Sequence, residues 1–304
     1  RKMYTMEWPD MGEMLHKSLY LFADALDRGG QQWNTLDQTE CHSIMDGVMD
    51  TIIDDYGEGV LTSTYRYRYL GRRLKRIGRR AAWTLTEHLQ KGDFIPSEFE
   101  VRFGRGGKFP PILVELGNGQ QFFLEGRIDR VDFWEGEDAV YARIIDYKTG
   151  DKKLDISAVY YGLSLQLLVY LQAVLAAKRN DRRPVKPGGV FYFKIDDPIV
   201  NLENLTSSVE KALARELRMR GLVLEDVSVA RHMDHDIGTS DVIPVGLTKE
   251  GEFNRYSSVL DESDFMALLQ HAMSLVRTMG GDRAGQQEWP ACRHLLLLLV
   301  HLPF

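Results

Sequence analysis

Two short segments decide the fold of this chain, Gly126-Arg-Ile-Asp-Arg-Val-Asp132 and Ile145-Asp-Tyr-Lys-Thr-Gly150. The second ends an apolar run typical of a buried strand. Strand side chains alternate between faces, so Asp146 and Lys148 share one face and Tyr147 lies on the other. A carboxylate and an ammonium at the end of a buried strand are costly unless they are paired or metal-bound. Thr149-Gly150 ends the strand and predicts that this pair is accessible at the sheet edge.

The first segment predicts a strand that forms a hairpin with the second, so that Asp129 approaches Asp146. Two neighbouring carboxylates repel each other unless a cation lies between them. Mg²⁺ prefers such oxygen ligands, and it would polarise a phosphate oxygen and activate a water molecule. Lys148 would then hold that water or offset charge that develops on the phosphate.

A D-x-K triplet alone is more often a surface ion pair, and the next predicted helix favours the functional interpretation. In Tyr161-Gly-Leu-Ser-Leu-Gln-Leu-Leu-Val-Tyr170, Gln166 and Tyr170 lie four residues apart on one face of an otherwise apolar helix. Buried polar groups need partners, and a metal site with bound DNA would supply them. The alternative is a helix with one wetter face.

The order of predicted elements indicates an α/β fold with helices on both sides of a central sheet. Apolar periodicity predicts helices over 11–26, 35–54, 62–90, 158–177, 205–218 and 262–279, and strands over 98–103, 112–116, 121–134, 139–147 and 189–193. We expect a single domain over 1–304, with a helical part (1–92), an α/β core (93–200) and a mostly helical part (201–304).

Composition is that of a globular protein: 44% of the 304 residues are hydrophobic and 27% are charged. The formal net charge of -6 argues against a generally basic nucleic-acid binder. Two cysteines are too few for a disulfide scaffold, which favours a cytoplasmic protein. No signal peptide or membrane span is predicted. Because the first residue is Arg1, we expect a fragment of a longer chain.

The predicted third helix carries eight cations within fifteen residues, the strongest candidate for a phosphate-contacting surface. Interleaved tyrosines could stack on bases of a single strand. The alternative is a solvated face or a contact with a partner protein. The arginines predicted to bind DNA are Arg72, Arg73, Arg76, Arg79 and Arg80.

Together these segments resemble the RecB-family branch of the PD-(D/E)XK nucleases, and in particular the AddB-type domains of helicase–nucleases. The resemblance extends from about residue 10 to about residue 280, and it includes a weaker motif, Gly12-Glu-Met-Leu-His16. It implies a restriction-endonuclease-like core with a central mixed sheet. It also implies a Mg²⁺- or Mn²⁺-dependent exonuclease that degrades DNA, as a single strand or an unwound duplex, beside an AddA-like helicase partner in double-strand-break repair.

The resemblance also implies roles for individual residues. The metal ligands fall on His16, Asp129 and Asp146, with help from the backbone carbonyl of Tyr147. The catalytic lysine falls on Lys148. Gln166 and Tyr170 match an additional motif that touches DNA and orients the site, and Glu100 occupies the place of an upstream acidic residue.

One part of the resemblance fails. AddB-type domains bind a [4Fe–4S] cluster through one upstream cysteine and a C-terminal group of three. Here Cys292 could be the first of that group, but Leu295 and His301 follow at the next positions, and Cys41 lies in a predicted helix. One thiolate cannot hold a cluster that needs four, so Cys292 is at most a remnant.

Other patterns in the sequence are weaker indications of function. His232 and His235 lack a convincing fourth ligand for zinc, and Gly104-Arg-Gly-Gly107 predicts a turn because no helix follows it. No ATP-binding P-loop is present. Two alternatives to the exonuclease of a helicase–nuclease stay open: an inactive nuclease fold that serves as a DNA-binding or scaffolding module, and a stand-alone RecB-like exonuclease.

Overall fold

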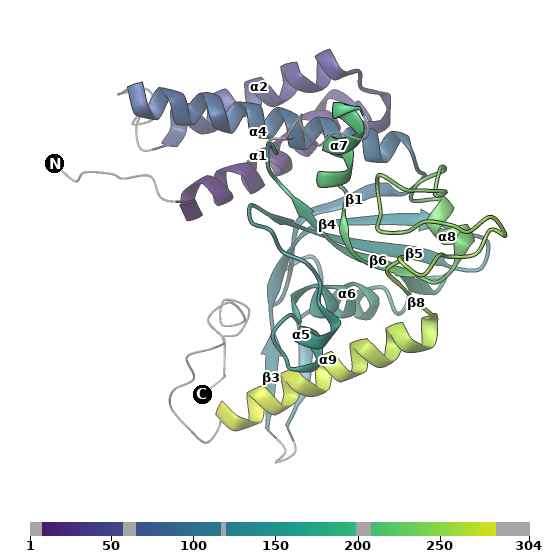
Figure 1. The fold of residues 1–304 in the computed structure, drawn as a ribbon. Coiled ribbons are helices and arrows are strands. Elements are labelled where there is room, and N and C mark those ends of the chain that lie inside the picture. The colour runs from purple at the N-terminus through teal and green to yellow at the C-terminus, as the bar shows by residue number, and fades with distance from the viewer. Residues whose placement is uncertain (1–7, 57–64, 117–119, 199–207, 284–304) are drawn as a thin grey trace.

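The computed structural model of the chain describes residues 8–56, 65–116, 120–198 and 208–283, with the backbone alone at 8–10 and 281–283. At its centre is a six-stranded sheet in the order β1-β4-β5-β6-β7-β8 (Figure 1). The β5–β6 and β7–β8 pairs are parallel and the other neighbours are antiparallel, which confirms the predicted mixed sheet. The strands are β1 (Ile95–Phe103), β4 (Gly126–Glu135), β5 (Val140–Lys148), β6 (Val185–Lys194), β7 (Arg220–Leu224) and β8 (Val259–Leu260).

Helices cover both faces of this sheet, as Figure 1 shows. One face packs against α1 (Trp8–Gly29), α2 (Gln38–Asp55) and α4 (Tyr65–Gln90), in a core that also contains Ile145 and Tyr147 of β5. The other face packs against α6 (Gln166–Ala177) and α9 (Glu262–Arg283), in a core that contains Ala142 and Ile144. Side chains of β5 thus alternate between two apolar layers, as its sequence predicts. Shorter helices are η1 (Trp33–Thr35), α5 (Ile156–Tyr160), α7 (Val209–Glu216) and α8 (Val227–Arg231).

Two predicted elements differ from the observed ones, and two observed strands were not predicted. The strand predicted over 121–134 is interrupted at Glu125: β3 (Gln121–Leu124) pairs with β2 (Ile112–Glu115) in a separate two-stranded sheet, and only β4 joins the central sheet. The helix predicted over 158–177 is divided into α5 and α6, because Gly162 adopts a φ of 76°, a left-handed conformation that ends a helix. Strands β7 and β8 were not predicted, so the sheet extends beyond residue 200.

Among the described helices, none is both long and apolar enough to cross a bilayer. Cys41 is fully buried in α2 beside Thr86, with 3.8 Å between Sγ and Oγ1. Cys292 lies outside the described residues.

Candidate active site

The hairpin of β4 and β5 brings the two predicted carboxylates together. Arg130 pairs with Ile145 in the antiparallel register, so Asp129 and Asp146 are the next facing positions. An Asp129 carboxylate oxygen accepts a hydrogen bond of 2.7 Å from the backbone N–H of Tyr147. This bond anchors Asp129 to the neighbouring strand and fixes its carboxylate at the end of β5.

Helix α1 supplies the predicted histidine. Its Gly12 lies beside Thr149, so the helix crosses the end of β5. One turn later, Nδ1 of His16 lies 3.4 Å from a carboxylate oxygen of Asp129. Burial lowers the pKa of His16, but the contact with Asp129 outweighs burial and raises the pKa above its ordinary value. The helix thus folds back onto the sheet, which spacing alone could not show.

Glu100 completes a group that could hold a cation. It lies between Phe99 and Val101, which pair with Arg130 and Ile128, and it therefore faces Asp129. His16, Glu100 and Asp129 each offer a ligand atom, and these atoms all lie within 4.8 Å of one another. Burial, and then the charge of Asp129, raise the pKa of Glu100.

Asp146 lies beside this group, and its role as a metal ligand stays a prediction. Its carboxylate is almost fully buried and forms an ion pair with the ammonium of Lys148. Burial and the negative charge of Asp129 raise its pKa, and Lys148 opposes that rise. Glu100 rather than Asp146 therefore joins His16 and Asp129 in the compact group. The Tyr147 carbonyl stays a prediction, since the observed contact of Tyr147 with Asp129 is through its N–H.

The helix pair lies as its spacing predicts. The side-chain amide of Gln166 donates a 2.9 Å hydrogen bond to the hydroxyl of Tyr170, one turn along α6. Burial, and then the charge of Asp146, raise the pKa of Tyr170, so its phenol stays protonated. A protonated hydroxyl that already accepts from Gln166 has its proton free to donate.

These residues open onto one cleft of about 1000 Å³, lined by His16, Asp129, Asp146, Lys148, Gln166 and Tyr170. The Gly104–Gly107 turn forms part of its rim, and Gly104 has a φ of 147°. Four further cations line the cleft, and the sequence analysis assigned no role to them. Arg127 belongs to the segment Gly126–Asp132, and Lys152 follows the segment Ile145–Gly150. These cations are Arg102, Arg105, Arg127 and Lys152.

The donor set suits Mg²⁺ or Mn²⁺. Carboxylate oxygens of Glu100 and Asp129 converge with one imidazole nitrogen, and Asp146 adds a buried carboxylate beside them. Hard divalent cations favour oxygen ligands and tolerate imidazole. The cation would also relieve the repulsion among these carboxylates, which burial makes stronger.

None of the arginines of α4 lines this cleft. Arg79 pairs with Asp46 of α2, and Arg76 and Arg80 both pair with Asp197. Intramolecular carboxylates therefore offset much of the predicted basic face. That Arg72, Arg73, Arg76, Arg79 and Arg80 bind DNA stays a prediction.

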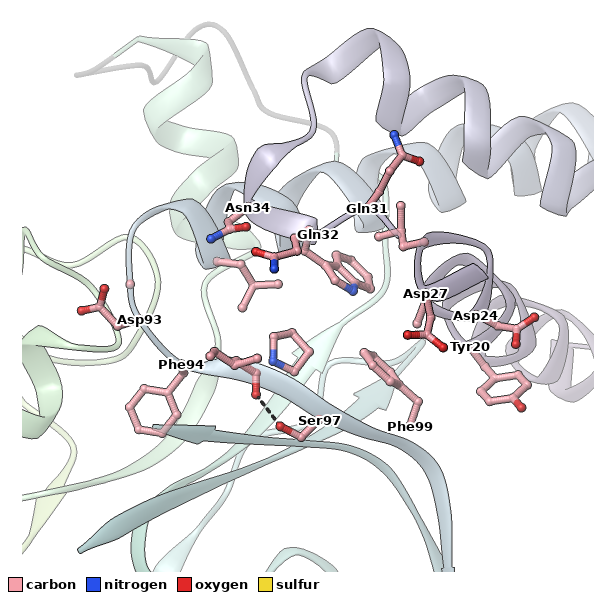
Figure 2. A pocket seen from close by; sticks show the side chains of 17 residues that line it. Tyr20, Asp24, Asp27, Gln31, Gln32, Asn34, Asp93, Phe94, Ser97 and Phe99 are labelled. Atoms are coloured by element: carbon pink, nitrogen blue, oxygen red, sulfur yellow. Dashed lines mark hydrogen bonds between the residues drawn. The ribbon is translucent and has the colours of Figure 1, made fainter. Parts of the chain in front are cut away.

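A second cavity, of about 730 Å³, lies at the beginning of β1 (Figure 2). Asp24 and Asp27 of α1 line it together with Phe94 and Phe99. None of the predicted catalytic or metal-binding residues lines it, so the site belongs to the larger cleft at the other end of β1.

The remaining candidate ligands have other environments. His232 and His235 both contact one carboxylate oxygen of Asp93, at 2.6 and 2.8 Å, and His232 stacks on Trp134. The chain does not fit a [4Fe–4S] cluster, because Cys41 is enclosed in the helical core and Cys292 alone cannot replace four thiolates.

The chain is similar in sequence to several known proteins. A similar protein is an ATP-dependent helicase/deoxyribonuclease subunit (AddB) of Alkaliphilus oremlandii, 47% identical over 285 residues, or 93% of this chain and 25% of the relative. The proteins of the same name from Alkaliphilus metalliredigens and Caldanaerobacter subterraneus are 45% and 43% identical, over 93% and 88% of this chain and 25% and 23% of theirs. The chain spans about a quarter of the length of these relatives.

The family model described as "PD-(D/E)XK nuclease superfamily" matches residues 1–294, nearly the whole chain. The match includes both strands of the Asp129–Asp146 hairpin, the helix that carries His16 and the helix that carries Gln166. The mixed sheet flanked by helices is the core that the sequence predicts for this family. By its sequence and its fold, this chain belongs to the PD-(D/E)XK nuclease superfamily.

Proposed function

We propose that this chain hydrolyses phosphodiester bonds of DNA with Mg²⁺ or Mn²⁺. The observation that carries the proposal is the convergence of His16, Glu100 and Asp129 within 4.8 Å in front of the Asp146–Lys148 pair. A cation site and an ammonium group in one cleft are the two positive charges that an attack on a phosphodiester needs.

The residues divide this work by their chemistry. His16, Glu100, Asp129 and Asp146 would hold the ion, which when bound polarises a phosphate oxygen and makes water a better nucleophile. Lys148, on the same face of β5, offsets negative charge that grows on the phosphate as the bond breaks.

Gln166 and Tyr170 act on the DNA rather than on the ion. Tyr170 lines the cleft, its hydroxyl accepts from Gln166, and a phosphate oxygen would be a suitable acceptor for its proton. Their mutual hydrogen bond restricts both side chains, so that less conformational entropy is lost when DNA binds.

Substitution of the ion pair tests the proposal. Asp146→Ala or Lys148→Ala should reduce cleavage of end-labelled single-stranded DNA by about 10²- to 10⁴-fold, the range for loss of one catalytic group. DNA binding should be largely retained, and a chelator should stop cleavage by the unsubstituted chain. Lys153→Ala, an exposed change nearby, is the control.

Either variant cutting at the wild-type rate would show that the assigned site is wrong. If the unsubstituted chain does not cut over a range of Mg²⁺ and Mn²⁺ concentrations, the inactive DNA-binding or scaffolding module becomes the better description.

We further propose that the chain acts as the nuclease part of a larger helicase–nuclease. The support is its identity of 47% and 45% to relatives that are named as subunits of an ATP-dependent helicase/deoxyribonuclease. The chain matches about a quarter of the length of each relative. An AddA-like helicase partner would supply the unwound strand that this cleft degrades during double-strand-break repair. Comparing the activity of the chain alone with its activity beside such a helicase on duplex ends would test this role.

A further inference from the structure

The chain turns sharply after β5 and returns over the cleft. The backbone N–H of Lys152 donates a 3.0 Å hydrogen bond to the carbonyl of Gly150, which closes a tight turn. The carboxylate of Asp151 pairs with Arg220 of β7. Arg220 is also the register partner of Tyr192 on β6. The ion pair of Asp151 with Arg220 therefore holds the turn beside Tyr192.

This turn places a second lysine beside the first. The ammonium of Lys152 lies 4.9 Å from the centre of the Tyr192 ring, and that of Lys148 lies 5.7 Å from the same centre. Tyr192 is also the register partner of Asp146 on the neighbouring strand. Both ammonium groups therefore gather around one buried ring, next to the carboxylate of the proposed site.

The two lysines differ in their partners. Lys148 pairs with Asp146, whereas the ion pairs of the described residues include none that involves Lys152. Lys152 is half-buried, and burial, followed by repulsion from Lys148, lowers its pKa. A partly buried cation beside another cation is unfavourable unless an anion joins them. The carboxylate of Asp146 is already paired with Lys148, so a further anion beside Lys152 would stabilise its charge.

The cleft itself indicates which anion fits. Arg102, Arg105 and Arg127 also line it, so the cleft carries several cations besides the two lysines. A single phosphate needs only one or two of these charges. A strand with phosphates at regular intervals would engage successive cations along such a groove.

We propose that Lys152 forms a phosphate subsite for the DNA backbone, occupied by the phosphate that neighbours the one beside Lys148. This inference rests on the proposed nuclease function. Lys152 would position the strand by contact with a non-bridging oxygen, and the turn held by Asp151 and Arg220 would keep its ammonium in place. It would not act on the bond that breaks.

The chain offers a matched control in Lys153, which is adjacent, exposed and not part of the cleft. Lys152→Met keeps the apolar stem over Tyr192 and removes only the charge, so its fold should survive. We expect Lys152→Met to weaken binding of a short single-stranded oligonucleotide about tenfold in the presence of chelator. The slope of log affinity against log salt should fall by about 0.7, the value for one phosphate contact on a single strand.

A second measurement locates the contact. Methylphosphonate substitution removes the charge of one phosphate at a time, and one position should weaken binding by the wild type but not by Lys152→Met. In cleavage assays, Lys152→Met should raise KM with little change in kcat, and Lys152→Arg should restore KM.

The results separate the two proposals. Equal binding by Lys152→Met and Lys153→Met, or methylphosphonate effects that add fully to the Lys152 change, would overturn the subsite even if the wild type cuts DNA. A fall in kcat at unchanged KM would also overturn it, because Lys152 would then act on the chemical step. If the wild type binds the strand with the predicted contact but does not cut it, the result supports the phosphate subsite and contradicts the proposed nuclease function.

Discussion

Glu100 holds a backbone conformation that side chains other than glycine rarely adopt, with a φ of 48° inside β1. The same residue points a carboxylate at His16 and Asp129 and pairs with Arg127 at 2.7 Å. Strained backbone is commonly found at functional sites, where neighbouring structure maintains it. We interpret the strain at Glu100 as the cost of aiming its carboxylate at the ion site.

This interpretation predicts that a substitution that relieves the strain stabilises the fold and reduces cleavage. Glu100→Gly should raise the free energy of unfolding by about 1 kcal/mol without divalent ions, because glycine accepts a positive φ and one like charge is removed beside Asp129. The same change should lower Mg²⁺-dependent cleavage. Urea denaturation with chelator measures the first effect, and Glu100→Gln, which keeps the φ penalty, is the control. Loss of stability in Glu100→Gly would contradict the interpretation.

At the scale of elements, the hairpin of β4 and β5 carries a second ionic group on the face of the sheet that packs against Trp33 and Phe94. Asp132 accepts hydrogen bonds from Arg130, at 2.6 and 2.8 Å, and from Arg143, at 2.7 Å. All three side chains are buried, and the guanidinium groups lie over the rings of Trp33 and Phe94. The group joins β4 to β5 three residues along β4 from Asp129, so we infer that it sets the hairpin geometry on which the site depends.

Removing the carboxylate of this group leaves two buried cations without their shared partner. Asp132→Asn should lower the free energy of unfolding by about 3 to 5 kcal/mol, the range for a broken buried ion pair. Asp46→Asn, which breaks the more exposed pair with Arg79, should cost at most about 1 kcal/mol. Chemical denaturation of both variants tests the contrast. Similar losses in the two variants would show that the buried group contributes no more than a surface pair.

At the scale of the whole molecule, the site joins elements that are distant in the chain. His16 comes from α1, Glu100 from β1 and Asp129 from β4, and they converge only when the helical layer packs on the sheet. An ion held between these elements would bind the folded state and not the unfolded chain. Its binding free energy would therefore appear as stability.

Thermal unfolding should show this coupling without any assay of cleavage. Mn²⁺ or Mg²⁺ at a hundredfold excess over the dissociation constant should stabilise the fold by about 2.7 kcal/mol and raise Tm by several degrees. Asp129→Asn should lose most of that shift, whereas Asp138→Asn, an exposed change at the far end of the hairpin, should keep it. An equal shift in both variants would place the ion elsewhere.

Local pattern was sufficient for part of this picture. Period-two alternation placed Asp146 and Lys148 on one face and Tyr147 on the other, because strand geometry is a property of consecutive residues. Helical spacing likewise joined Gln166 to Tyr170. The break at Gly162 was missed because an apolar run on both sides of a glycine predicts one continuous helix.

The sequence by itself therefore determined the mixed α/β class, the carboxylate hairpin and the helix pair, since each depends on spacing within one or two neighbouring elements. Only the tertiary structure decided that α1 crosses the end of β5, that Glu100 joins His16 and Asp129, and that Lys152 returns over Tyr192. These facts depend on packing between segments far apart in the chain, and no local period records which of them will meet. The charges of α4 show the same limit, because Asp46 and Asp197, which offset them, lie in other segments.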